Sequence, residues 1–168
     1  MADDKAIIFC GVKQMEILAL EMQYNGEKVK FDLELIPFED KYYTIYQAIY
    51  NECFYEMREA LDVKPFNFYN SIDQIADKKS NIYLLIQNNE LIGSVACYNN
   101  EIDDLIVNKK YQNQGYGQQL LLFAIKQMQI HGINPIKLHV ANWNEKAVNL
   151  YERNFFKCIN IEKINGRL

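Results

Sequence analysis

The sequence predicts one domain, residues 1–168, with a mixed fold of the α/β (α+β) class. Three observations support this prediction. The length lies within the roughly 100–200 residues of a common domain. Short apolar runs alternate with period two, whereas longer runs follow the period of a helix. The predicted order is strands, two helices, three strands, then helix, strand, helix, strand. Because repeated strand–helix–strand units are missing, we expect a mixed sheet with few crossovers.

Asn25-Gly26 predicts a hairpin near the N-terminus, because this dipeptide suits a two-residue turn between strands. The arms would be residues 15–24 and 28–36, and the second arm alternates apolar and charged side chains. Residues 1–30 are therefore expected to contain strands. The remaining predicted elements are helices at 40–61, 67–79, 117–130 and 142–153, and strands at 81–87, 91–98, 101–107, 136–140 and 155–164.

Composition excludes several classes of protein. The apolar fraction of 49% and charged fraction of 24% are typical of globular domains. No run approaches the roughly 18 apolar residues of a membrane helix, and the acidic start does not resemble a signal peptide, so a cytoplasmic location without a membrane partner is expected. The net charge of −4 and the lack of a basic block argue against a nucleic-acid partner. The four cysteines form no CxxC pair, so no metal site is predicted.

Gly115 and Gly117 stand where the predicted strand 101–107 leads into a helix. The first N–H groups of a helix are unpaired and carry partial positive charge, and glycine lets a phosphate come close to them. A Walker loop would need Gly-Lys-Ser/Thr, and a dinucleotide loop would need a glycine where Leu120 stands. The pattern Gln112-x-x-Gly115-x-Gly117 matches a third type of phosphate loop. The alternative is a loop with two turn glycines before an ordinary buried helix, which would show the same sequence pattern without binding a phosphate.

Two longer signatures make the chain resemble the GNAT superfamily of N-acetyltransferases. Residues 101–121, EIDDLIVNKKYQNQGYGQQLL, are similar to the family's acetyl-CoA motif of strand, loop and helix. Residues 139–157 are similar to its N-x-x-A-x-x-L-Y…(G)F element, with Asn154 at the glycine and Phe155 at the aromatic position. The resemblance covers about Phe31 to Ile161.

The resemblance implies a GNAT-like sheet that is splayed at a cleft for acetyl-CoA and flanked by about four helices. Backbone groups near Ile106 and Val107 are expected to bind the pantetheine chain, with the Val107 amide facing the thioester oxygen. The residues that we assign to the cofactor in this way are Ile106, Val107, Gln112, Asn113, Gln114, Gly115, Tyr116, Gly117, Gln118, Asn144, Ala147 and Tyr151.

Tyr151 is the predicted general acid that would protonate the leaving thiolate. It lies seven residues after Asn144, nearly two helical turns, so the two residues share a face; packing of the helix on the sheet and capping by Asn144 are the alternatives. The predicted general base is Glu101 or Asp103. In a regular strand both face the same side as Val107, and Asp104 faces the other. The alternative is that these acidic residues are merely solvated at the start of the strand. Chains of water molecules would then accept the proton of the amine.

The predicted activity is transfer of an acetyl group from acetyl-CoA to a primary amine by direct attack in a ternary complex, because no cysteine has a recognisable nucleophile context. The acceptor, a small molecule or an amine of a peptide or protein, stays open. An alternative is a non-catalytic CoA-binding regulatory or interaction module.

Compared with this family, residues 1–30 are an N-terminal extension, and the C-terminus is short, since only 13 residues follow Phe155. The family's last strand would then be missing, which leaves a sheet edge open. We predict that the N-terminal segment AIIFCGV covers this edge, within one chain or by exchange in a homodimer.

Overall fold

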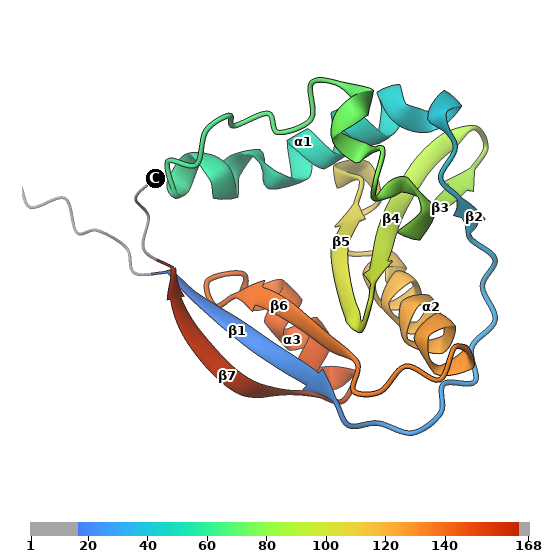
Figure 1. The fold of residues 1–168 in the computed structure, drawn as a ribbon, viewed down its shortest axis with the longest axis vertical. Helices are drawn as coiled ribbons and strands as arrows, with labels where there is room; N and C mark the ends of the chain where they lie inside the picture. The colour runs from blue at the N-terminus through green and yellow to red at the C-terminus, as the bar shows by residue number, and fades with distance from the viewer. Residues whose placement is uncertain (1–16, 165–168) are drawn as a thin grey trace, which may run out of the picture.

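The computed structural model describes residues 17–164 and consists of one seven-stranded sheet with helices on both faces (Figure 1). The strand order is β2-β3-β4-β5-β6-β1-β7, and only β5 and β6 are parallel among the paired strands. The mixed sheet with few crossovers is confirmed. The strands are β1 (Ile17–Tyr24), β2 (Ile36–Pro37), β3 (Ile82–Gln87), β4 (Glu90–Tyr98), β5 (Glu101–Val107), β6 (Lys137–Ala141) and β7 (Phe156–Ile164), and the α-helices are α1 (Tyr43–Ala60), α2 (Tyr116–Ile130) and α3 (Glu145–Arg153).

Two apolar clusters hold the layers together. One cluster lies between the sheet and the helices α2 and α3, and contains Met22, Leu138 and Phe156 from three different strands. The other lies between α1 and the strands β3 to β5, and is built around Tyr46 and Tyr69. The α1 layer therefore covers one half of the sheet, whereas β6, β1 and β7 have no helix on that face (Figure 1).

Local sequence signals account for several elements. Asn88 and Asn89 both have positive φ, 50° and 60°, which is the requirement of the tight turn that joins β3 and β4. Gly132, with φ of 69°, follows the end of α2 and lets the chain leave the helix. The strands predicted at 81–87 and 91–98 and the helix predicted at 117–130 are thus confirmed.

The hairpin predicted at Asn25-Gly26 is wrong. β1 is its first arm, but β1 pairs antiparallel with β6 on one side and β7 on the other, so no edge is left for a second arm. Residues 25–35 form no helix or strand and run along α2, where the Gln129 side chain accepts a hydrogen bond from the Val29 N–H at 2.9 Å. The alternating pattern is real, since Val29, Leu33 and Leu35 pack on the core, but burial of one side does not require strand pairing.

β1 takes the place of the last strand that the short C-terminus cannot supply. It pairs with β7 along the whole length of that strand, from Tyr24↔Phe156 to Ile17↔Ile164. The N-terminal extension thus supplies a partner strand within the same chain. The segment AIIFCGV, to which we assigned this role, lies outside the described residues.

The second predicted helix, at 67–79, is also wrong, and the described chain has three α-helices rather than about four. Only a short 3₁₀ turn forms at Ile72–Ile75. The reason is tertiary: the Tyr69 backbone bonds to α1, with its N–H donating to Asn51 Oδ1 at 2.9 Å and its carbonyl accepting from the Gln47 and Asn51 amides at 2.8 Å.

The turn between α3 and β7 differs from the predicted motif by one residue. Asn154 has φ of −103°, whereas Phe155 has φ of 67° and is 65% exposed. The buried aromatic side chain is Phe156, which packs on Tyr151 with ring centroids 6.0 Å apart. Phe155 therefore occupies the position that suits glycine, and Phe156 is the aromatic residue of the motif.

We expect Phe155→Gly to stabilise the domain, because a bulky residue at positive φ costs on the order of 1–2 kcal/mol and the phenyl ring buries little surface. The thermal unfolding midpoint should rise by a few degrees. Phe155→Ala is the matched control, since it removes the ring but keeps the Cβ and its strain. Equal midpoints for the two variants would contradict this account.

Candidate active site

A cleft of about 640 Å³ opens where β5 and β6 separate. The two strands pair only at Glu101↔Lys137 and Ile102↔Leu138, and toward their C-terminal ends they are no longer paired. Residues of β5, β6, α1 and α3 line the space between them. The predicted separation of strands 101–107 and 136–140 is thus present.

A β-bulge in β5 shapes one wall of this cleft. Ser94 lies opposite Ile106 and Ala96 opposite Asp103, so two residues of β5 stand against Val95 alone. Asp104 is at the bulge, with φ of 47°. Bulges insert one residue and turn the following side chains to the other face.

The bulge overturns the predicted alternation along β5. Val107 packs in the cluster with α2, as Ile102 does, whereas Ile106 packs in the cluster with α1. Asp104 faces α1, where the Tyr50 hydroxyl donates to its Oδ1 at 3.1 Å. Asp103 and Asp104 consequently both line the cleft, although the regular alternation placed Asp104 on the other side.

The backbone of Val107 presents its N–H group to the open space. The Asn108 N–H donates to the Ile92 carbonyl on β4 at 2.9 Å. Because N–H groups alternate in direction along a strand, the Val107 N–H points toward the β6 side, where the pairing with β6 has already ended at Ile102. The Val107 carbonyl accepts from the Gln112 side chain at 3.0 Å, which ties the loop to the strand.

Tyr151 projects from α3 into the same cleft. Its side chain is 9% exposed, and burial, together with the charge of Asp103, raises the pKa of its phenol to about 12. The phenol therefore stays protonated throughout the physiological range. Asn144 is the N-cap of α3 and accepts from the Ala147 N–H at 3.2 Å, so its capping role is confirmed.

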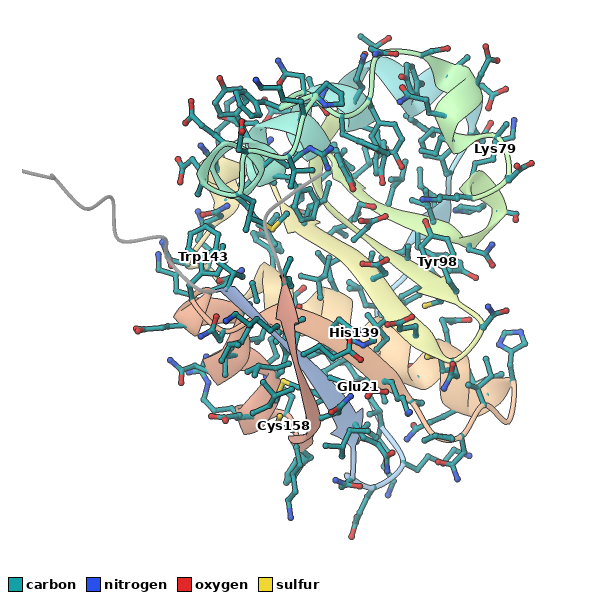
Figure 2. All side chains as sticks on the ribbon, turned by 60° about the vertical axis from the view of Figure 1, so that its left-hand side comes forward. Glu21, Lys79, Tyr98, His139, Trp143 and Cys158 are labelled. Atoms are coloured by element: carbon teal, nitrogen blue, oxygen red, sulfur yellow. The ribbon has the colours of Figure 1, made fainter. Side chains whose placement is uncertain are left out.

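Glu101 bonds to His139 Nδ1 on the neighbouring strand rather than lining the cleft itself. His139 lines the cleft and stands opposite Glu21 of β1, and Figure 2 shows both side chains on the face of the sheet that α1 leaves open. Glu21 also accepts from Lys137 Nζ at 2.8 Å. The sequence alone did not place His139; the structure puts it on the cleft side.

A second cavity, of about 470 Å³, lies at the start of α2. Gly115 is the residue before this helix and has φ of 87°, a conformation that L-side chains rarely adopt. A Cβ on Gly117 would make ordinary contacts, 3.4 Å from Leu150 and 3.9 Å from Val107, whereas a larger side chain would press on Leu150, which lines both cavities.

Lys146 and Arg153 of α3 also line this second cavity, and sequence reasoning missed both. The available signal was their spacing of seven residues, which puts them on one helix face next to the loop. Helix N–H groups, glycine and two cations together fit the phosphates of a nucleotide.

The predicted site residues divide into three groups. Four of them, Glu101, Gln114, Tyr116 and Gly117, line neither cavity; the Gln114 amide bonds to the Lys110 carbonyl and the Tyr116 ring packs on Tyr111. Asn113, Gly115 and Gln118 line the second cavity. Those on the main cleft are Asp103, Ile106, Val107, Gln112, Asn144, Ala147 and Tyr151.

Metal-ligand clusters and membrane-spanning helices are both absent from residues 17–164. No group of three or more potential metal ligands occurs there. In the same part of the chain, no helix has the length and apolar character to cross a membrane.

The long cleft and the basic cavity beside it form a site that suits an elongated ligand with phosphate groups. A family model described as the acetyltransferase (GNAT) family matches residues 42–155. The chain belongs to this family, and acetyl-CoA is its cofactor. The two cavities adjoin each other, since Lys146 and Leu150 line both of them.

One curated protein and two solved structures show what the chain is similar to. The [ribosomal protein bS18]-alanine N-acetyltransferase of Haemophilus ducreyi is 29% identical over 124 residues, which is 71% of this chain and 84% of that protein. A structure from Pyrococcus horikoshii OT3 is 20% identical with a TM-score of 0.62, over 80% of this chain and 99% of that one. A GNAT-family structure from Novosphingobium aromaticivorans is 17% identical with a TM-score of 0.64; the match covers 88% of this chain and 62% of that one. The structural matches support the fold.

Proposed function

We propose that the domain is an N-acetyltransferase that moves the acetyl group of acetyl-CoA directly to a primary amine. The observation that carries this proposal is the arrangement of three groups around one cleft. The Val107 N–H comes from β5, the Tyr151 phenol from α3, and carboxylates from the bulge of β5. The cofactor supplies an activated acetyl thioester; the chain supplies the groups that handle charge and protons.

The Val107 N–H is placed to donate to the acetyl oxygen as negative charge develops on it. One such donor typically contributes a factor of about 100–1000 in rate. Tyr151, protonated because burial raises the pKa of its phenol, is the proposed donor to the departing thiolate. Both groups stand on regular elements, which hold them rigidly.

The proton of the attacking amine needs an acceptor, because an alkylamine is cationic near pH 7. Asp103 lines the cleft whereas Glu101 does not, so Asp103 is the base that we propose first. Glu101 can act through His139, to which it is hydrogen-bonded. A pH–rate profile of Asp103→Asn beside Glu101→Gln separates these two routes.

A covalent acetyl-enzyme is not part of this proposal. Cys53 is the cysteine on the cleft wall, and burial raises the pKa of its thiol to about 11. A thiol that stays protonated is a poor nucleophile. The similarity to an enzyme that acts on the alanine of a ribosomal protein keeps a peptide amine among the acceptors, beside small amines.

The experiment that tests this function is release of CoA from acetyl-CoA with a panel of primary amines, with the acetylated product identified by mass spectrometry. Amine-dependent CoA release supports the proposal. Tight acetyl-CoA binding without transfer to any amine would instead identify a non-catalytic CoA-binding module.

The phosphate-loop part of the proposal makes its own prediction. We expect Gly117→Val to weaken acetyl-CoA binding at least tenfold, because a branched side chain would press on Val107 of the main cleft and on Leu150, which lines both cavities. Calorimetry measures the affinity. Gly132→Ala is the control, since it strains a positive φ far from the loop. Unchanged affinity in a folded Gly117→Val protein would contradict the assignment.

A further inference from the structure

β7 is the last strand of the sheet, and one of its two edges stays open. Figure 1 shows it outermost, and among residues 17–164 only β1 pairs with it. All of its residues after Phe156 are exposed, and three of them are isoleucines: Ile159 (47% exposed), Ile161 (57%) and Ile164 (39%). A long edge strand with apolar side chains and unpaired backbone groups readily pairs with another strand.

A β-bulge in β7 decides which of its side chains share a face of the sheet. Glu21 of β1 stands opposite Asn160 and Met22 stands opposite Cys158, so Ile159 is the extra residue. Residues that stand opposite each other in an antiparallel pair lie on the same face. The extra residue shifts the alternation along β7 by one position.

Cys158 and Ile161 lie on the face of the sheet that α2 and α3 cover. They stand opposite Met22 and Leu20 of β1, and both of these residues pack in the apolar cluster under those helices. In a regular strand, residues three positions apart would lie on opposite faces, so the bulge is what brings this cysteine and isoleucine together.

Lys157 and Glu162 lie together on the other face. They stand opposite Gln23 and Ala19 of β1, which alternate with the residues that face the helices. Within residues 17–164 neither side chain belongs to an ion pair. The exposed edge thus carries one cation and one anion on the same face, on either side of the bulge.

We propose that β7 pairs antiparallel with β7 of a second copy of this chain, about a twofold axis at the bulge, so that the two sheets become one. This register places Lys157 opposite Glu162 of the second copy, and Cys158 opposite Ile161 of the second copy. Both pairs unite residues of the same face, as a continuous sheet requires. Because the axis repeats each pair, the contact contains two ion pairs and two apolar pairs.

Other registers lose this match. A shift by one residue places Lys157 opposite Ile161 or Lys163, whose side chains lie on the helix-covered face. A shift by two residues matches the faces again but separates Lys157 from Glu162. The edge is therefore complementary to itself in charge and in face, which favours a second copy over an unrelated strand. Two strands, β6 and β1, separate β7 from β5, so this pairing does not depend on the proposed function.

Charge reversal tests both the partner and the register. Sedimentation equilibrium of the full chain should give twice the chain mass of 19.8 kDa. Lys157→Glu and Glu162→Lys should each raise the dimer dissociation constant roughly tenfold or more, because two ion pairs become two like-charge contacts. An equimolar mixture of the two variants should associate again, since each copy then presents charges of one sign to the opposite sign of the other. Lys78→Glu, at an exposed site before β3, is the control and should associate as the wild-type protein does.

A cysteine cross-link tests the register directly. Ile161→Cys puts a thiol opposite Cys158 of the second copy, at a separation that a disulfide can bridge after a small adjustment. Oxidation with diamide should give a covalent dimer, and peptide mass spectrometry should find the disulfide between positions 158 and 161. Ile164→Cys is the matched control, because in this register it faces no cysteine.

Any of three results would overturn the inference: a wild-type protein that is monomeric at every concentration, single charge reversals that associate as tightly as the wild-type protein, or two reversed variants that do not associate when mixed. If the wild-type protein is monomeric and the β7 amides are still protected from hydrogen exchange, the edge belongs to another segment of the same chain, such as AIIFCGV, and not to a second copy.

Discussion

Replacing Tyr151 by phenylalanine is expected to lower kcat by roughly 10–10⁴-fold while acetyl-CoA affinity stays close to that of the wild-type protein. The ring packs on Phe156 and would keep this contact. The loss should therefore appear in the chemical step and not in stability.

The pH profile sharpens this test. Because burial raises the pKa of the Tyr151 phenol to about 12, the wild-type rate should show no fall caused by this group below about pH 11. The variant should be slower by a constant factor over the same range. Tyr55→Phe is the matched control, since Tyr55 packs on Phe66 and does not line the cleft. A Tyr151→Phe enzyme with unchanged kcat would remove this residue from the chemistry.

Loss of strand β1 is expected to abolish cooperative folding. β1 lies between β6 and β7, and Met22 in its centre is fully buried. The Asn142 side chain also accepts from the Leu18 N–H at 3.1 Å, which ties the strand to the turn before α3. A protein that lacks residues 1–24 would expose the edges of both neighbouring strands and the core beneath them. Circular dichroism during heating should show no sharp transition.

A point variant tests the same idea without truncation. Met22→Ala should lower the free energy of unfolding by about 2–5 kcal/mol, the usual cost of emptying a buried site. Gln23→Ala, next along the strand and only partly buried, should cost far less. Similar denaturation midpoints for the two variants would mean that β1 contributes little to the core.

The sequence by itself determined those parts of the fold that depend on neighbours along the chain. Two asparagines that accept positive φ joined β3 to β4, and Gly132 ended α2, because these turns depend on the residues that form them. The glycine loop before α2 was predicted for the same reason, since φ of 87° at Gly115 is a local requirement. Family membership followed from residues 101–121 and 139–157, whose chemistry is carried by short, continuous segments.

Only the tertiary structure decided which distant segments meet. The alternation in residues 28–36 was visible, but its partner was a helix face and not a second strand. A bulge cannot be seen in an alternation of apolar residues, so Asp104 was placed on the wrong side. Lys146 and Arg153 could be assigned to a candidate phosphate site only once the fold placed them beside a loop about thirty residues earlier in the chain. In each case the missing information was a contact between segments far apart in sequence, which the local pattern of residues does not specify.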